Sequence, residues 1–120
     1  MSAGDVCHIE LSTTDLAASR TFYETIFGWT FQLVPGMEGY ALFNTPSGLG
    51  GGMNSSERAD PPSDKGPIVH LEVEDIEASL KRIEELGGKT LLPKTKISDE
   101  FGAYGLFLDN VGNRLGLWSR

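Results

Sequence analysis

The sequence predicts an α+β fold built from two similar βαβββ modules. A short alternating segment with a histidine, "HIEL" at residues 8–11 and "HLEV" at residues 70–73, stands before a helical pattern in each half of the chain. Several strand-like segments follow the helical pattern in both halves. The repeated unit is too long for a two-unit solenoid, which favours two modules. The alternative is one mixed α+β sheet whose two strand–helix units are alike by coincidence.

The first predicted strand, at residues 8–12, alternates between polar and apolar side chains. Ile9 and Leu11 share one face, which a helix is expected to cover. His8 and Glu10 share the opposite face. A register slip of one residue would turn every side chain of this strand to the other face.

A helix is expected next, because the period of the apolar residues changes. Asp15 is a suitable N-cap and Gly28 a suitable C-terminal stop. The apolar side of this helix would consist of Leu16, Phe22, Tyr23, Ile26 and Phe27. Three more strands are predicted at residues 29–34, 40–44 and 49–53. The first module therefore covers about residues 4–54.

A polar segment rich in turn formers, residues 55–67, is predicted to be the linker. The second module, about residues 68–119, repeats the order of the first. Asp75 can cap a helix whose inward side would carry Ile76, Leu80, Ile83 and Leu86. After a stop at Gly87 and Gly88, three strands are expected at residues 89–93, 103–109 and 113–118.

Size, composition and charge exclude several classes of protein. The chain has 120 residues, 39% of them hydrophobic, which suits one globular domain. Its net charge of −7, without a cluster of Lys or Arg, disfavours nucleic-acid binding. No apolar run reaches the ~20 residues of a membrane span, and the start lacks the features of a secretory signal. A single cysteine, Cys7, fits a reducing compartment, so a cytoplasmic location is expected; as a neighbour of His8 on the strand, Cys7 should be buried.

Three segments closely resemble signatures of the glyoxalase, bleomycin-resistance and extradiol-dioxygenase superfamily, also called vicinal oxygen chelate proteins. They are "DLAASRTFYETIFGW", "VEDIEASLKRIEELGGK" and "DNVGNRLGLW". The resemblance covers nearly the whole chain. It implies that the modules form an open, cup-like mixed sheet around a ligand cavity, with the helices on the outer face. It also implies homodimers and, in enzymatic members, a divalent metal (Zn, Ni, Co or Fe) in the cup.

The family's metal ligands are only partly present. His8 and His70 match the histidine or glutamine ligands of the first strands, and both are expected to point into the cup. The last strands have Gly52 and Gly116 where the resemblance implies carboxylates. Two neutral imidazoles leave the charge of a divalent ion uncompensated and fall short of the usual ligand sets of catalytic metals.

Two glutamates can take over part of the missing chemistry. Glu10 and Glu72 stand two residues after the histidines, about 6.5 Å along the same strand face. They are the predicted base or additional metal ligand. In the alternative interpretation, His8 and His70 are polar liners of the cavity, hydrogen-bonded to Glu or Ser.

The cavity itself is predicted from small and aromatic residues. Gly52 and Gly116 can leave open volume for an organic ligand, although "GLGGG" can also be a flexible, bulged edge. Phe31 and Trp118 are the aromatic residues expected to stack on a planar ligand.

Two functions follow as hypotheses. In the first, the protein binds a small organic molecule in the cup and is a lyase or isomerase with a degenerate metal site, acting on a metal-chelated carbonyl compound. In the second, it is a metal-independent protein of the bleomycin-resistance type that sequesters a drug or metabolite. The missing carboxylates disfavour ordinary lactoylglutathione lyase and ring-cleaving dioxygenase activity.

Overall fold

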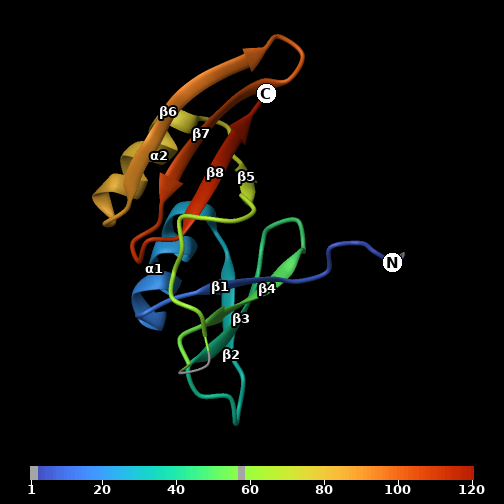
Figure 1. Cartoon of the computed structure of the whole chain (residues 1–120), viewed down its shortest axis with the longest axis vertical. Coiled ribbons are helices and arrows are strands. Elements are labelled where there is room, and N and C mark those ends of the chain that lie inside the picture. Colours follow the sequence, from blue (N-terminus) through green and yellow to red (C-terminus); the bar gives the residue numbers. More distant parts are fainter. Residues whose placement is uncertain (1–2, 57–58) are drawn as a thin grey trace. The chain divides into compact units, whose positions relative to one another are not determined.

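The computed structural model describes residues 3–56 and 59–120. It divides into two compact units, the N-terminal unit Met1–Pro62 and the C-terminal unit Ser63–Arg120, and the division falls inside the predicted linker. In the described part of the chain, each unit contains one helix and one four-stranded mixed sheet (Figure 1). The predicted α+β fold with two βαβββ modules is confirmed.

The N-terminal unit follows the order strand, helix, three strands. Its elements are β1 (Ile9–Ser12), α1 (Leu16–Phe27), β2 (Thr30–Leu33), β3 (Tyr40–Asn44) and β4 (Gly50–Asn54). The strand order in the sheet is β1-β4-β3-β2, with β1 parallel to β4 and the other pairs antiparallel. Cys7 precedes β1 and is exposed, so its predicted burial is wrong: the alternation of the strand does not extend back to it.

Both predicted ends of α1 are present. The Asp15 carboxylate accepts a hydrogen bond of 3.0 Å from the backbone N–H of Ala18, and Gly28 ends the helix in the left-handed conformation with φ 70°. The inner side of α1 carries Tyr23, which stacks on Trp29 with 4.4 Å between ring centroids. Trp29 in turn stacks on Phe43 of β3 at 4.5 Å, so that aromatic rings form the centre of this core.

The C-terminal unit repeats this order. Its elements are β5 (His70–Glu72), α2 (Ile76–Glu85), β6 (Lys89–Ser98), β7 (Gly102–Leu108) and β8 (Arg114–Ser119). The sheet order is β5-β8-β7-β6, with β5 parallel to β8. Figure 1 shows α2 beside this sheet, and α2 packs on β6, β7 and β8. Among the described residues, no helix has the length and apolarity needed to cross a bilayer.

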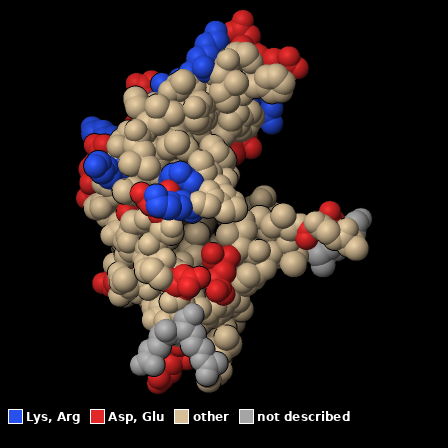
Figure 2. Space-filling model, in the orientation of Figure 1, with Lys and Arg blue, Asp and Glu red and all other residues tan. Residues whose placement is uncertain are grey.

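The helix α2 is held by a cap and by a buried apolar side. The Asp75 carboxylate accepts from the backbone N–H of Ala78 at 3.0 Å, as predicted. Ile76, Leu80 and Ile83 are buried, together with a sheet face of small and apolar side chains: Ala103, Phe107, Leu115 and Leu117. The exposed side of α2 and the neighbouring surface of β6 carry interspersed acidic and basic side chains (Figure 2).

The strand β6 is longer than predicted. The expected end was residue 93, but β6 continues through Pro93 to Ser98. Proline lacks a backbone N–H and is tolerated here because β6 lies at the edge of the sheet. The pairing with β7 shows one register shift just before this position, between Thr90 and Leu92, and one that spans it, between Leu92 and Thr95.

The last part of the predicted linker belongs to the C-terminal unit. The backbone N–H of Ser63 donates to the Asn113 side chain at 3.2 Å, and its carbonyl accepts from the backbone N–H of Arg114 at 3.0 Å. The Arg114 guanidinium also donates to the carbonyl of Gly66 at 2.7 Å. These contacts tie residues 63–66 to the beginning of β8.

Candidate functional site

The polar face of the N-terminal sheet is set by the strand register. Glu10 of β1 lies opposite Gly52 of β4, and Gly52 lies opposite Leu42 of β3, so these residues share one face. The other face carries Phe43 and Met53, which are buried. Glu10 is therefore on the sheet face opposite the aromatic core, as the alternation of β1 predicts.

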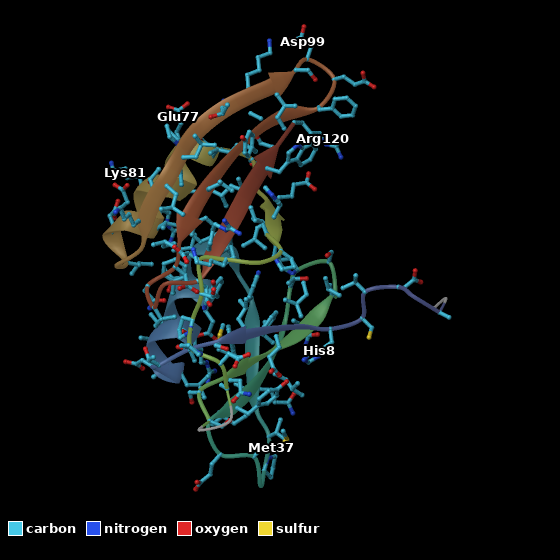
Figure 3. All side chains as sticks on the ribbon, viewed as in Figure 1. His8, Met37, Glu77, Lys81, Asp99 and Arg120 are labelled. Atoms are coloured by element: carbon cyan, nitrogen blue, oxygen red, sulfur yellow. The ribbon has the colours of Figure 1, made fainter. Side chains whose placement is uncertain are left out.

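Three side chains form a hydrogen-bonded cluster on this polar face. The Tyr40 hydroxyl lies 3.2 Å from Nε2 of His8 and is hydrogen-bonded to the Glu10 carboxylate. A tyrosine hydroxyl has one proton to donate, and an ionised carboxylate can only accept. We infer that Tyr40 donates to Glu10 and accepts from the Nε2–H of His8. Figure 3 shows His8 at the start of β1.

The ring of Tyr40 fills the space beside Gly52. A Cβ at residue 52 would collide with the Tyr40 hydroxyl and with the ring carbon that carries it. Only glycine at this position lets the phenol lie across β4 and reach the side chains of β1. The open volume expected beside Gly52 is therefore occupied by the chain's own side chain.

The surroundings of Tyr40 favour its neutral form. Burial raises the pKa of the hydroxyl above its ordinary value, and the negative charge of Glu10 and the hydrogen bond to Glu10 raise it further. At neutral pH the hydroxyl is therefore a protonated donor in a site whose charge comes from Glu10. Because this proton is donated to Glu10, the cluster offers a ligand the remaining acceptor positions of the Glu10 carboxylate, which suit a donor group.

We expect Glu10→Gln to lower the pKa of Tyr40 without returning it fully to the ordinary range. The substitution removes the charge of Glu10, whereas burial, the largest cause of the raised pKa, remains. The measurement is a spectroscopic pH titration, with Tyr40→Phe in each background to isolate this tyrosine from the other two. Glu24→Gln on the exposed side of α1 is the control and should leave the pKa unchanged.

The raised pKa also has a consequence for stability. A group whose pKa is higher in the folded state adds stability below its unfolded pKa, about 10 for tyrosine, and this contribution is lost as the pH rises through the folded pKa. Tyr40→Phe should therefore show a weaker loss of stability in alkaline solution than the native chain. An equal loss in both chains would contradict this coupling.

In the C-terminal unit the corresponding face is aromatic. His70 lies opposite Gly116, and Trp118 lies between Glu72 on β5 and Tyr104 on β7. The neighbouring residue Leu117 points to the opposite side and is buried in the core, so Trp118 occupies the face that does not pack on α2. That Trp118 stacks on a ligand stays a prediction.

The His70 imidazole covers Gly116 as Tyr40 covers Gly52. A Cβ at residue 116 would collide with Nδ1 and Cε1 of His70. The ring of Tyr104 is the next aromatic group, with its centroid 6.4 Å from that of His70. Both glycines therefore accommodate a ring of the chain itself, and neither adjoining space is left open.

Trp118 is held in a defined orientation. Its indole Nε1–H donates to the backbone carbonyl of Phe101 at 2.8 Å. The guanidinium carbon of Arg120 lies 5.5 Å from the centroid of the indole ring, and Nε of Arg120 lies 3.9 Å from a carboxylate oxygen of Glu72. Figure 3 shows Arg120 next to the end of β8.

Phe31 does not lie on the predicted face. Its partner across β2 and β3 is Phe43, and the two rings are 5.8 Å apart between centroids. Because Phe43 is buried in the core, Phe31 belongs to the core side of the N-terminal sheet, away from Glu10 and Gly52. Its choice as a stacking residue on the polar face is wrong, since the pairing of β2 with β3 could not be derived from alternation alone.

The residues of each unit do not fit a resident metal site. The polar faces offer one histidine and one glutamate each, and the glycines beside them carry rings in place of carboxylates. Within either unit, the described His, Cys, Asp and Glu side chains form no group of three that could hold a metal ion. That His8 and His70 point into one shared cup stays a prediction.

Tyr40, Tyr104 and Arg120 were not singled out from the sequence as site residues. Alternation within β3 and β7 could have indicated that Tyr40 and Tyr104 lie on the polar faces, because residues two positions apart in a strand share a face. Their partners on the neighbouring strands come only from the register.

Comparisons with known proteins agree with this architecture. Residues 6–46 match the family model described as bleomycin resistance protein-like N-terminal. The putative glyoxylase CFP32 of Mycobacterium tuberculosis is 29% identical over 114 residues, which cover 92% of this chain and 43% of the relative. The anthracycline biosynthesis protein DnrV of Streptomyces peucetius is 28% identical over 126 residues, covering 92% and 45%. The chain thus spans less than half the length of these relatives.

Solved structures show the same fold. A glyoxalase-related enzyme from Fulvimarina pelagi superimposes with a TM-score of 0.76 at 18% identity, covering 98% of this chain and 88% of the other. The fosfomycin resistance protein FosX from Listeria monocytogenes gives 0.76 at 16% identity, covering 99% and 95%, and a FosX variant has been solved with Mn(II).

Fold and sheet faces together define a protein of paired βαβββ modules. The family model over residues 6–46, the glyoxalase-named relatives and the shared fold together support the glyoxalase, bleomycin-resistance and dioxygenase superfamily, the vicinal oxygen chelate proteins, as the class that this chain resembles.

Proposed function

We propose that this protein binds a small organic molecule without a resident metal ion, as the bleomycin-resistance hypothesis expects. One observation carries the proposal. Rings of the chain cover both Gly52 and Gly116, the positions where the family resemblance implies metal-binding carboxylates. The Tyr40 ring and the His70 ring take the space into which such carboxylates would extend.

The two polar faces supply groups that suit an organic ligand. In the N-terminal unit, the Tyr40 hydroxyl, the Glu10 carboxylate and the His8 imidazole offer hydrogen-bonding groups at close spacing. In the C-terminal unit, Trp118 and Tyr104 offer aromatic surface of the kind that stacks on planar molecules. A few fixed polar groups beside aromatic surface are the usual composition of a ligand site.

The comparisons support the same class of ligand. The matching family model is named for bleomycin resistance, and the Streptomyces relative is named for anthracycline biosynthesis. Both names refer to organic molecules. A homodimer and a cytoplasmic location stay predictions of this proposal.

Metal analysis of the purified chain tests the proposal. We expect well below one equivalent of Zn, Ni, Co, Fe or Mn per chain, and no difference between the native chain and His70→Ala. Mass spectrometry of the denatured protein should instead detect any retained organic molecule.

The opposite result would favour a lyase or isomerase with a degenerate metal site. It would consist of one metal ion per chain, lost on substitution of His8 or His70. Asp99→Ala is the matched control, because Asp99 is an exposed carboxylate in the turn before β7 and reports nonspecific binding of cations.

A further inference from the structure

The carboxyl-terminal end of β8 brings a cation, an indole and a carboxylate together. The Arg120 guanidinium carbon lies 5.5 Å from the centroid of the Trp118 ring, within the ~6 Å over which a cation is attracted to an aromatic face. Nε of Arg120 lies 3.9 Å from Oε2 of Glu72. A planar cation thus lies over an aromatic face and beside a negative charge.

The surface beneath the guanidinium is built by three strands. Trp118 of β8 is the register partner of both Glu72 on β5 and Tyr104 on β7. The hydrogen bond from the indole Nε1–H to the carbonyl of Phe101, 2.8 Å long, holds the ring in place. An aromatic surface that is oriented before binding loses little conformational freedom when a ligand stacks on it.

Arg120 itself is held loosely. Its side chain is 86% exposed, and that of Glu72 is 64% exposed. Exposed ion pairs of this kind contribute little to stability because water screens them. A ligand can therefore displace Arg120 from the indole without disturbing the sheet.

We propose that Trp118 and Glu72 form a subsite for a planar organic cation of the guanidinium or amidinium type. In the absence of a ligand, Arg120 occupies this subsite as an internal mimic. The inference rests on the proposed function, since it names the chemical class of the molecule that the protein binds. A planar cation is favoured over a compact ammonium because it can stack on the indole and donate to the carboxylate in the same orientation.

Titration calorimetry with two probes tests the subsite in the full chain. The probes are phenylguanidinium and phenylurea, which have a similar shape but differ in charge. We expect phenylguanidinium to bind about 3- to 30-fold more tightly, the range of a cation–aromatic contact reinforced by a carboxylate. Glu72→Gln should remove most of this preference and leave the affinity for phenylurea unchanged.

The Arg120→Ala variant tests whether Arg120 occupies the subsite when no ligand is bound. We expect it to bind phenylguanidinium several-fold more tightly than the native chain, because the ligand no longer competes with Arg120. Trp118→Leu should weaken the binding of both probes. Glu77→Gln, on the exposed side of α2, is the matched control for loss of one negative charge and should bind as the native chain does.

Several outcomes would overturn the inference. Equal affinity for the two probes would exclude a cation subsite, even where metal analysis upholds the proposed function. Unchanged or weaker binding by Arg120→Ala would exclude Arg120 as the occupant. Failure of phenylguanidinium to bind either the native chain or Arg120→Ala, with native circular dichroism in both, would exclude the subsite altogether.

Discussion

Phe107→Ala should lower the free energy of unfolding of this protein by about 3–5 kcal/mol, the usual range for removing a buried phenylalanine ring. Phe107 is 0% exposed and lies on the core face of β7, opposite Leu115 of β8. The loss combines the transfer free energy of the ring with the cavity that it leaves. Since a domain is stable by only about 5–15 kcal/mol, the C-terminal unit would lose a large share of its stability.

The matched control is Phe101→Ala. It removes the same atoms, but Phe101 lies in the turn before β7 and is 60% exposed, and its contact with Trp118 uses the backbone carbonyl, which alanine retains. We expect a change within about 0.5 kcal/mol. Chemical denaturation of both variants measures the difference, and similar losses would contradict the placement of the core.

Gly51→Ala should have the second largest effect, because it separates β1 from β4. A Cβ at residue 51 would collide with the backbone carbonyl of Ile9 and with the ring of Phe43. The carbonyl cannot move aside without displacing β1, to which Gly51 is paired in register. Overpacking of this kind costs about 1–3 kcal/mol, and more where the obstacle is backbone.

The displacement should also be visible at the polar face. Since β1 carries Glu10, the Tyr40 hydroxyl should lose its charged neighbour, and its pKa should fall toward the ordinary value. Gly50→Ala is the control: its nearest contacts would be at 3.2 Å, so its neighbours need to move by only a few tenths of an ångström. A stable Gly51→Ala variant with an unchanged Tyr40 titration would show that the close approach of β1 and β4 is not required.

The local elements could be predicted because their signals lie within a few residues. Asp15 and Asp75 cap helices where a carboxylate precedes an apolar period, and Gly28 ends α1 with a positive φ that glycine adopts at little cost. The polar placement of Glu10 followed from the alternation of β1. These features depend on neighbouring residues in the chain, so they can be predicted without knowledge of the fold.

The candidate site could be predicted only in part. His8 and Glu10 were recognised as a pair, but Tyr40, which joins them, comes from a strand thirty residues away and reaches them through the register of β3 with β4. Phe31 was assigned to the wrong face for the same reason. Strand pairing is a long-range choice, and a shift by one residue reverses every side chain.

By itself, the sequence determined that the chain forms two βαβββ modules, where its helices begin, and that no carboxylate stands at positions 52 and 116. Only the tertiary structure showed which side chains occupy the space beside those two glycines. The glycines allow the rings of Tyr40 and His70 to extend over the neighbouring strands, into space that a Cβ would take. Such a contact depends on the packing of side chains between strands that are distant in the chain, and no local pattern encodes it.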